Sequence, residues 1–233
     1  MDSTVDENIR FARGGSLMEI LEEIIQQLRK GDEKEVVDSV KRGLQQGLDW
    51  EVILGRGLFA GMETVGRLFK EEDMFVPEVI MSAKAMNAGI KVLEPLMTGK
   101  EEMCRKGIVI LGTVKGDLHD LGKSLVAMML RGAGFEVIDI GVDASAERFV
   151  EAARSHHAQM VGMSALLTTT MPYMKTVIEA LRRTRGTEGV RTMIGGACVT
   201  QQYADQIGAD AYGENAGAAV EEARALMGAR PAL

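Results

Sequence analysis

The first half of the chain repeats its apolar residues with the three-and-four spacing of an α-helix. These repeats cover residues 16–31, 32–47, 49–69 and 77–93. The first begins at Ser16 with a capping-box pattern, in which a serine precedes a glutamate by three positions, and the polar residues 1–14 are expected outside it. Four helices of this length predict a small antiparallel bundle over residues 1–97.

The pattern changes after residue 106. Apolar runs typical of buried strands occur at residues 108–114, 135–140, 160–164, 190–194 and, more weakly, 210–212. Helical patterns alternate with them at residues 121–131, 145–155, 172–184, 200–207 and 216–228. Five β-α units with short connections predict an α/β fold over residues 107–233, with a doubly wound, five-stranded parallel sheet in flavodoxin-like (Rossmann-like) order. The charged, aperiodic residues 98–106 are interpreted as the linker.

Composition and charge exclude several classes of function. The chain has 233 residues, of which 46% are hydrophobic, and this is enough for a sizeable core. A formal net charge of −7 argues against nucleic-acid or anionic-membrane partners. No apolar run reaches the length of a membrane span, and the charged N-terminus lacks a signal-peptide core. The two cysteines form neither a disulfide framework nor a zinc pattern, so we expect a protein of the reducing cytoplasm.

Small and polar residues follow the predicted strands. The loop after the first strand contains D-x-H-x-x-G, with Asp117 placed to accept one imidazole N–H of His119. Ser164 ends the third strand, and Gly195 and Gly196 end the fourth. In a doubly wound sheet these loops share one edge, where open α/β folds bind ligands. This edge offers one good metal ligand, which suits a metal that brings its own equatorial ligands.

Each of these residues also has an ordinary structural interpretation. His119 is then a loop histidine hydrogen-bonded to Asp117, and Ser164 satisfies backbone groups at the end of a strand. The glycine pair at 195–196 is then a simple turn. None of the three motifs decides the function alone, because short motifs often occur by chance.

Together the motifs resemble a known family. G-D-L-H-D-L-G at 116–122, S-x-L at 164–166 and the glycine pair are similar to the cobalamin-binding module of methionine synthase. The closer resemblance is to the small corrinoid proteins of methylamine, glycine betaine and O-demethylating methyltransferase systems. The helical half also resembles that family's four-helix cap, through G-M-x-x-V-G-x-x-F at 61–69 and F-V-P-E at 75–78.

The resemblance implies cobalamin bound without its own benzimidazole on cobalt, with His119 as the replacing ligand. Asp117 would accept the other imidazole N–H, and Ser164 would extend this relay to solvent. The cofactor contacts implied in the sheet half are Gly116, Asp117, Leu118, His119, Asp120, Gly122, Ser164, Leu166, Thr168, Gly195, Gly196 and Ala216. Those implied in the cap are Met62, Phe69 and Val76, of which the last two would shield the methyl group. Gly55 stands where methionine synthase has a glutamate, so a polar contact from that helix is in doubt.

The function implied by the resemblance is that of a methyl carrier in one-carbon metabolism. A substrate-specific methyltransferase would load the cofactor, and a second methyltransferase would pass the methyl group to a thiol or to tetrahydrofolate. A reductive activase would restore oxidised cobalt. A methyltransferase barrel typically takes ~250 residues, so we expect a subunit that depends on partners and not a complete catalyst. The linker would act as a hinge.

Two other classes share parts of this pattern. A cobalamin-dependent sensor or regulatory domain would hold adenosylcobalamin under its cap, but such proteins usually carry a DNA-binding domain. The small subunit of an adenosylcobalamin mutase shares D-x-H-x-x-G and S-x-L, but normally lacks this helical cap. Both remain alternatives at the level of the sequence.

Overall fold

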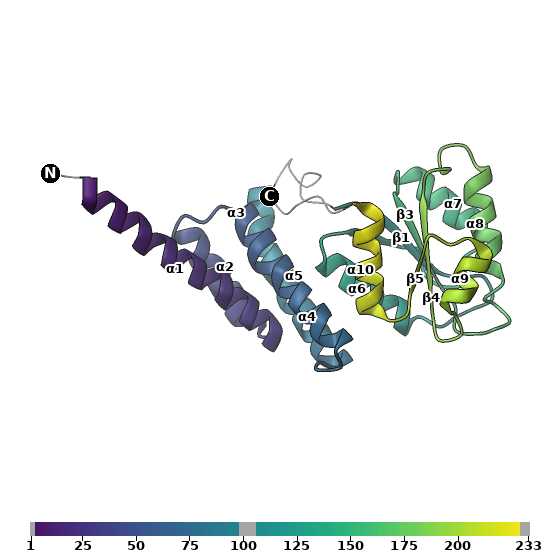
Figure 1. The fold of residues 1–233 in the computed structure, drawn as a ribbon, viewed down its shortest axis with the longest axis horizontal. Helices are drawn as coiled ribbons and strands as arrows, with labels where there is room; N and C mark the ends of the chain where they lie inside the picture. The colour runs from purple at the N-terminus through teal and green to yellow at the C-terminus, as the bar shows by residue number, and fades with distance from the viewer. Residues whose placement is uncertain (1–2, 98–105, 229–233) are drawn as a thin grey trace. The chain divides into compact units, whose positions relative to one another are not determined.

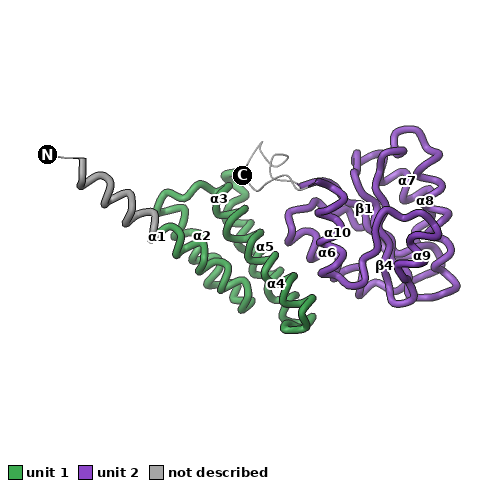
Figure 2. The backbone as a smooth tube through the Cα atoms, viewed as in Figure 1, with its two compact units in different colours: residues 1–104, 231–233 green, residues 105–230 purple. Residues whose placement is uncertain are grey.

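The computed structural model describes residues 3–97 and 106–228, and the side chains of its first helix from residue 17 onward. Contacts divide the chain into two compact units, a helical unit up to residue 97 and a sheet unit from residue 106 (Figure 2). Apart from Lys106, the predicted linker at 98–106 lies outside the described residues. Within the described ranges, no helix combines the length and apolar character needed to cross a bilayer.

Four helical segments form the first unit, as the apolar repeats predicted. They are α1 (Ser3–Lys30), α2 (Glu33–Gln45), the consecutive α3 (Trp50–Val52), η1 (Ile53–Phe59) and α4 (Ala60–Lys70), and α5 (Val76–Met97). Asp32 caps α2, because its carboxylate accepts the backbone N–H of Glu35 at 3.1 Å. Pro77 lies in the first turn of α5, where its missing N–H costs no helical hydrogen bond.

Two details differ from the sequence prediction. Helix α1 begins at Ser3, so the predicted start at Ser16 was wrong. The glycines at 14 and 15 do not stop it, because a glycine costs only about 1 kcal/mol in a helix and helix-favouring residues lie on both sides. The third segment contains a π-helix, η1, which the apolar spacing of an ordinary helix cannot reveal.

Buried aliphatic side chains hold the bundle together. Helix α2 packs against α1 and α5, and α4 packs against α1. A Cβ built on Gly61 of α4 would lie 2.5 Å from Cδ1 of Leu28 on α1, so glycine permits the close approach of these two helices. The fully buried residues of this core include Ile24, Leu28, Val36, Val40, Ile53, Leu58, Val65 and Leu93.

The second unit confirms the predicted α/β fold. Its strands are β1 (Ile108–Thr113), β2 (Glu136–Asp139), β3 (Met160–Ser164), β4 (Arg191–Gly195) and β5 (Ala211–Gly213). Its helices are α6 (Leu121–Gly132), α7 (Ala146–Ser155), α8 (Tyr173–Arg183), α9 (Gln201–Ile207) and α10 (Ala216–Met227). All strands pair in parallel in the flavodoxin-like order β2-β1-β3-β4-β5. Helices α6 and α10 cover one face, and α7, α8 and α9 cover the other (Figure 1).

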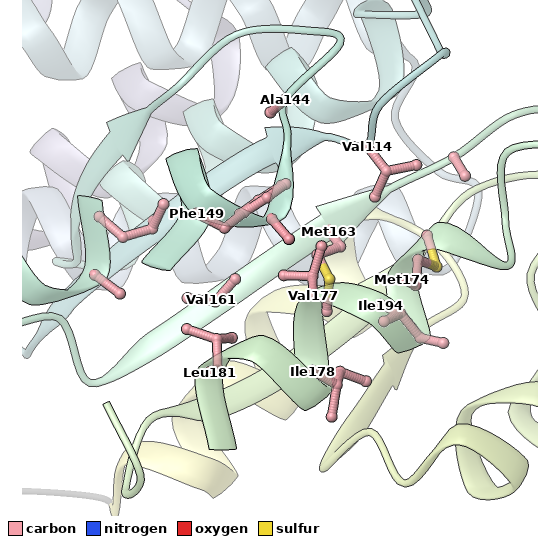
Figure 3. Packing of buried hydrophobic residues seen from close by; sticks show 14 of the residues in the cluster. Val114, Ala144, Phe149, Val161, Met163, Met174, Val177, Ile178, Leu181 and Ile194 are labelled. Carbon is pink, nitrogen blue, oxygen red and sulfur yellow. The ribbon is translucent and has the colours of Figure 1, made fainter. Parts of the chain in front are cut away.

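A hydrophobic cluster under α7 and α8 fixes one face of the sheet. Phe149 of α7 and Ile178 and Leu181 of α8 are almost completely buried, and they pack over Val161 and Ile194 of the central strands (Figure 3). Since burial of one such side chain contributes about 1.5–3 kcal/mol, this layer holds the carboxyl ends of the strands in place.

Strand register aligns four residues across the edge of the sheet. Thr113 pairs with Ser164, Ser164 with Gly195, and Gly195 with Gly213, so the last residues of β1, β3, β4 and β5 form one row. The loops that follow these strands therefore leave the sheet side by side.

The glycine pair after β4 has a packing role. A Cβ on Gly196, whose φ is +127°, would lie 1.9 Å from the carbonyl oxygen of Ala165, and one on Gly195 would lie 2.7 Å from that of Gly213. Both distances are too short for any side chain, so the strand ends approach each other only because both residues are glycine.

We expect Gly196→Ala to destabilise the sheet unit of the cofactor-free protein by about 3 kcal/mol or more, because it combines backbone strain with a clash against backbone. Hydrogen exchange of the β3 and β4 amides measures this loss. The matched control is Gly189→Ala, where a Cβ meets nothing within 4 Å, and it should stay within about 0.5 kcal/mol of wild type. Equal protection of the two variants would contradict the close-approach argument.

Candidate functional site

The loop after β1 carries His119 and is tied to the end of its own strand. The buried hydroxyl of Thr113 donates to the carbonyl oxygen of His119 at 2.9 Å. Gly116 has φ +84°, a left-handed conformation that favours glycine, and it turns the chain back toward the sheet. The loop backbone at His119 is thus held against the last residue of β1.

Asp117 is the centre of the site. Its side chain is completely buried. One carboxylate oxygen accepts the backbone N–H of His119 at 3.1 Å and lies 2.7 Å from Nδ1 of the same residue. The other oxygen accepts the backbone N–H groups of Leu166 and Leu167 at 2.8 and 3.2 Å, and the hydroxyl of Thr170 at 2.7 Å. The carboxylate therefore joins the β1–α6 loop to the β3–α8 loop.

These hydrogen bonds keep Asp117 ionised. Burial alone would raise the pKa of its carboxyl group, because it disfavours the charged form. The donors from Leu166, Thr170 and His119 outweigh burial, and they hold the pKa of Asp117 well below its usual range. An ionised carboxylate accepts hydrogen bonds only, so the proton between Asp117 and His119 belongs to Nδ1.

The imidazole of His119 is oriented by this contact and is open on its other side. With Nδ1–H donating to Asp117, the lone pair of Nε2 is available to a metal. Half of the His119 side chain is exposed, while its partner is fully buried. The pair therefore has the arrangement of a metal-ligating histidine with a carboxylate behind it.

Ser164 was expected to continue the relay beyond Asp117. In the described part of the chain, no hydrogen bond joins its hydroxyl to Asp117, and that place is taken by Thr170. Ser164 contributes its carbonyl oxygen, which accepts the backbone N–H of Val114 at 3.0 Å. Its role in a relay therefore stays a prediction, and Thr170 is a residue that the sequence analysis missed. The run of three threonines at 168–170, shortly after S-x-L, is the signal that could have found it.

Exposed apolar side chains surround His119. Leucines are usually buried, yet Leu118 is 71% exposed and Leu121 is 90% exposed, and Leu166 and Leu167 across the edge are each 41% exposed. Leu118, Leu166 and Leu167 belong to the two loops that Asp117 joins, and Leu121 is the first residue of α6. Exposed leucines on the segments that carry and adjoin one oriented imidazole suit a broad, partly apolar ligand.

The remaining predicted residues of the sheet unit fall into two groups. A Cβ on Gly122 would meet nothing within 4 Å, so the space beside the first turn of α6 is open, as a ligand slot there requires. Thr168 and Asp120 are exposed on the same loops. Ala216 is buried at the start of α10, and Gly195 and Gly196 lie close to the backbone of Gly213 and Ala165. The assignment of these three residues to the cofactor stays a prediction.

A buried lysine lies directly behind this slot. Lys123 is only 2% exposed and pairs with Asp120 at 2.8 Å and with Asp139 at the end of β2. A lysine in the first turn of a helix opposes the helix dipole, so these two carboxylates are needed to hold it there. Hydrogen bonds from Lys123 and Ser124 lower the pKa of Asp120 in turn. The sequence analysis missed Lys123, the residue after the D-x-H-x-x-G motif, because lysine is normally a surface residue.

The predicted cap residues lie in different environments within the helical unit. Phe69 is half-buried near the end of α4, and Val76 at the start of α5 is 43% exposed. Phe75, between them, is 68% exposed, so this end of the unit presents apolar side chains. Met62 lies in the core with 4% exposure, and Gly55 lies in η1 with open space where a Cβ would point. The assignment of Met62, Phe69 and Val76 to the cofactor stays a prediction.

The residues present fit a corrinoid better than a bare metal ion. Within residues 3–97 and 106–228, no group of three or more His, Cys, Asp and Glu side chains is placed to hold an ion. The site offers instead one oriented nitrogen, a border of leucines and an open slot beside Gly122. A macrocycle supplies the equatorial ligands of its metal, so the protein has to offer only one nitrogen and apolar side chains for the macrocycle.

Comparison with known proteins agrees with this chemistry. Two family patterns match the chain, and both describe a B12 binding domain, over residues 107–221 and 20–94. The chain is 49% identical to dimethylamine corrinoid protein 1 of Methanosarcina acetivorans over 180 residues, which cover 77% of this chain and 84% of that protein. It is 45% identical to dimethylamine corrinoid protein 1 of Methanosarcina mazei, covering 88% and 97%.

A solved structure matches both units as well. A chain of the methanol:cobalamin methyltransferase complex MtaBC from Methanosarcina barkeri superposes with a TM-score of 0.79 at 32% identity, covering 90% of this chain and 80% of that chain. Family patterns, relatives and structure thus agree with the resemblance found in the sequence. The chain belongs to the corrinoid proteins of methyltransferase systems, and its cofactor is a cobalamin-type corrinoid.

Proposed function

We propose that this protein is a methyl carrier that holds its corrinoid with His119 as the lower axial ligand. The observation that carries the proposal is the half-exposed imidazole, whose Nδ1 is held by a completely buried, ionised carboxylate. When bound, the corrinoid supplies the cobalt on which a methyl group is carried.

The protein's part is to present one nitrogen in a fixed direction. Asp117 holds a proton on Nδ1, so in the neutral imidazole the free lone pair belongs to Nε2. A carboxylate partner also makes the imidazole a stronger donor. Because five hydrogen bonds from two loops hold the carboxylate, the ring loses little conformational freedom when it binds a metal.

The names of the relatives support the choice of partners. Two of them are dimethylamine corrinoid proteins, and the structural neighbour comes from a methanol:cobalamin methyltransferase complex. We therefore assign a substrate-specific methyltransferase as the loading partner, with a methylamine as the favoured methyl donor. A second methyltransferase that delivers to a thiol or to tetrahydrofolate, and a reductive activase, complete the proposed system in the cytoplasm. Matches that cover both units favour a carrier over the sensor and mutase alternatives.

The helical unit is proposed to cover the reactive face of the cofactor. Phe69 and Val76 supply apolar surface at one end of the bundle, and exposed Phe75 enlarges it. Apolar side chains at this end would exclude water from the reactive face of the bound corrinoid when no partner covers it. Two partners must reach the same atom, so we propose that residues 98–106 act as the hinge.

Replacing His119 tests the proposed ligand. We expect the wild-type protein, reconstituted with cobalamin and reduced to Co(II), to give an axial splitting in its EPR spectrum that changes when histidine is labelled with ¹⁵N. His119→Ala should abolish that change and weaken cobalamin binding by roughly 10-fold or more, because loss of a residue that only orients a ligand already costs about 10- to 100-fold.

The matched control for this experiment is His156→Ala, since His156 lies at the far end of α7. It should keep the labelled splitting and the affinity of wild type. A spectrum of the wild-type protein that is insensitive to histidine labelling would refute ligation by His119, even if cobalamin still bound.

Asp117→Asn should destabilise the cofactor-free protein at pH 7 by roughly 2–4 kcal/mol, because an amide places N–H groups against donors that are buried. A depressed pKa stabilises the fold above the ordinary aspartate value and loses this effect as pH falls. The difference between wild type and variant should therefore shrink below about pH 4. Urea unfolding followed by circular dichroism measures it.

The control for Asp117→Asn is Asp205→Asn, which changes an exposed carboxylate of the same unit. It should change stability by less than about 0.5 kcal/mol at either pH. A constant difference between Asp117→Asn and wild type across the acid range would contradict an ionised Asp117.

A further inference from the structure

The loop between β2 and α7 contacts the His119 loop without touching His119 itself. The side chain of Asp143 in this loop accepts the backbone N–H of Gly116 at 2.7 Å. Its own N–H donates to the carbonyl oxygen of Asp117 at 3.0 Å. Asp143 thus bonds the two peptide groups that flank the Gly116–Asp117 linkage, where the D-x-H motif begins.

The backbone of Asp143 is in a conformation that side chains rarely adopt. Its φ is +50°, which Asp and Asn tolerate better than most residues and which glycine adopts freely. Strained conformations of this kind persist where the surroundings use them. The Cβ of Asp143 makes this conformation less favourable than it would be for glycine. The carboxylate accepts the N–H of Gly116, and this role explains why residue 143 is not glycine.

The contacts of Asp143 lead directly to the imidazole. Asp143 fixes the backbone of Gly116 and Asp117, and the side chain of Asp117 then sets the position of Nδ1 of His119. At the other end of the same loop, Lys123 binds Asp139, the last residue of β2. The β2 side of the sheet therefore holds the His119 loop at its beginning and at its end.

We propose that Asp143 is a positioning residue for the axial ligand, acting through Gly116 and Asp117 to fix the direction of the His119 imidazole. The proposal rests on the proposed function, because the direction of the ring matters only if His119 binds cobalt. It extends that function to a loop outside the D-x-H-x-x-G, S-x-L and glycine-pair motifs.

Three variants separate positioning from ordinary stability. Asp143→Gly removes the acceptor while keeping a residue that adopts φ +50° without strain, so the sheet unit should fold. Asp143→Asn keeps an oxygen acceptor and tolerates the same backbone, so it should rescue. The matched control is His157→Gly. His157 has the same φ of +50°, so glycine removes the same backbone strain, but it lies on the connection between α7 and β3, away from the site.

The first readout uses the cofactor-free protein labelled with ¹⁵N-histidine. At alkaline pH, where a free imidazole is neutral, imidazole NMR should find His119 of wild type as the Nδ1–H form alone. Asp143→Gly should mix the two ring forms, and Asp143→Asn and His157→Gly should retain one. The second readout is the reconstituted Co(II) protein, in which Asp143→Gly should weaken cobalamin binding about 3- to 10-fold and broaden the histidine-dependent splitting.

The outcomes distinguish the two ideas. If wild type shows histidine-dependent splitting and Asp143→Gly leaves both the splitting and the ring forms unchanged, Asp143 is no positioning residue, although His119 remains the ligand. If wild type shows no such splitting, the proposed ligation fails, and the ring forms in the cofactor-free variants still decide whether Asp143 orients His119. Mixed ring forms in Asp143→Gly with rescue by Asp143→Asn support the proposal.

Discussion

The site depends on a single buried carboxylate. Asp117 is taken out of water completely, which would be unfavourable for a charge without partners. Hydrogen-bond donors from His119 on one loop and from the β3–α8 loop offset the cost of burial, and they lower the pKa of Asp117. The position of His119, the path of the β3–α8 loop and the ionisation of the site all follow from satisfying this group. A fixed negative charge behind a half-exposed imidazole holds the proton on Nδ1 and sets the direction of the ring.

The architecture of the fold was predictable because the apolar residues follow a clear pattern in each half. The first half has the helical spacing throughout, and the second alternates strand runs with helical spacing. The helical repeats and the alternating strands of the second half required no tertiary knowledge, and even the strand order followed from short β-α connections. The start of α1 and the π-helix η1 were not predictable. Both depend on small free-energy differences between neighbouring backbone conformations, which sequence spacing does not register.

The site was predictable only in part, because a sequence motif contains the residues of one short segment and not their partners elsewhere in the fold. D-x-H-x-x-G and S-x-L identified the loops, because contacts within a short segment leave a pattern in sequence. Thr170, Asp143 and Lys123 reach the site from other elements or from inside a helix. Such partners are specified by register and loop path, so only the structure reveals them. The glycine pair had two interpretations in the sequence. The clash of a Cβ on Gly196 with Ala165 gives it a packing role, and its contact with the cofactor stays a prediction.

The apolar border of the site links cofactor binding to folding. Leu118, Leu121, Leu166 and Leu167 are exposed in the protein alone, and such surface is costly in water. A ligand that covers these side chains removes their area from water and stabilises the folded unit by RT ln(1 + [L]/Kd). Three of them lie on the two loops joined by Asp117, and Leu121 begins α6 directly after one of these loops. Binding therefore acts on the elements whose arrangement Asp117 already fixes, and the rigidity of the carboxylate network lowers the conformational entropy that the ligand must overcome. The same interaction that orients the nitrogen thus also prepares the surface around it.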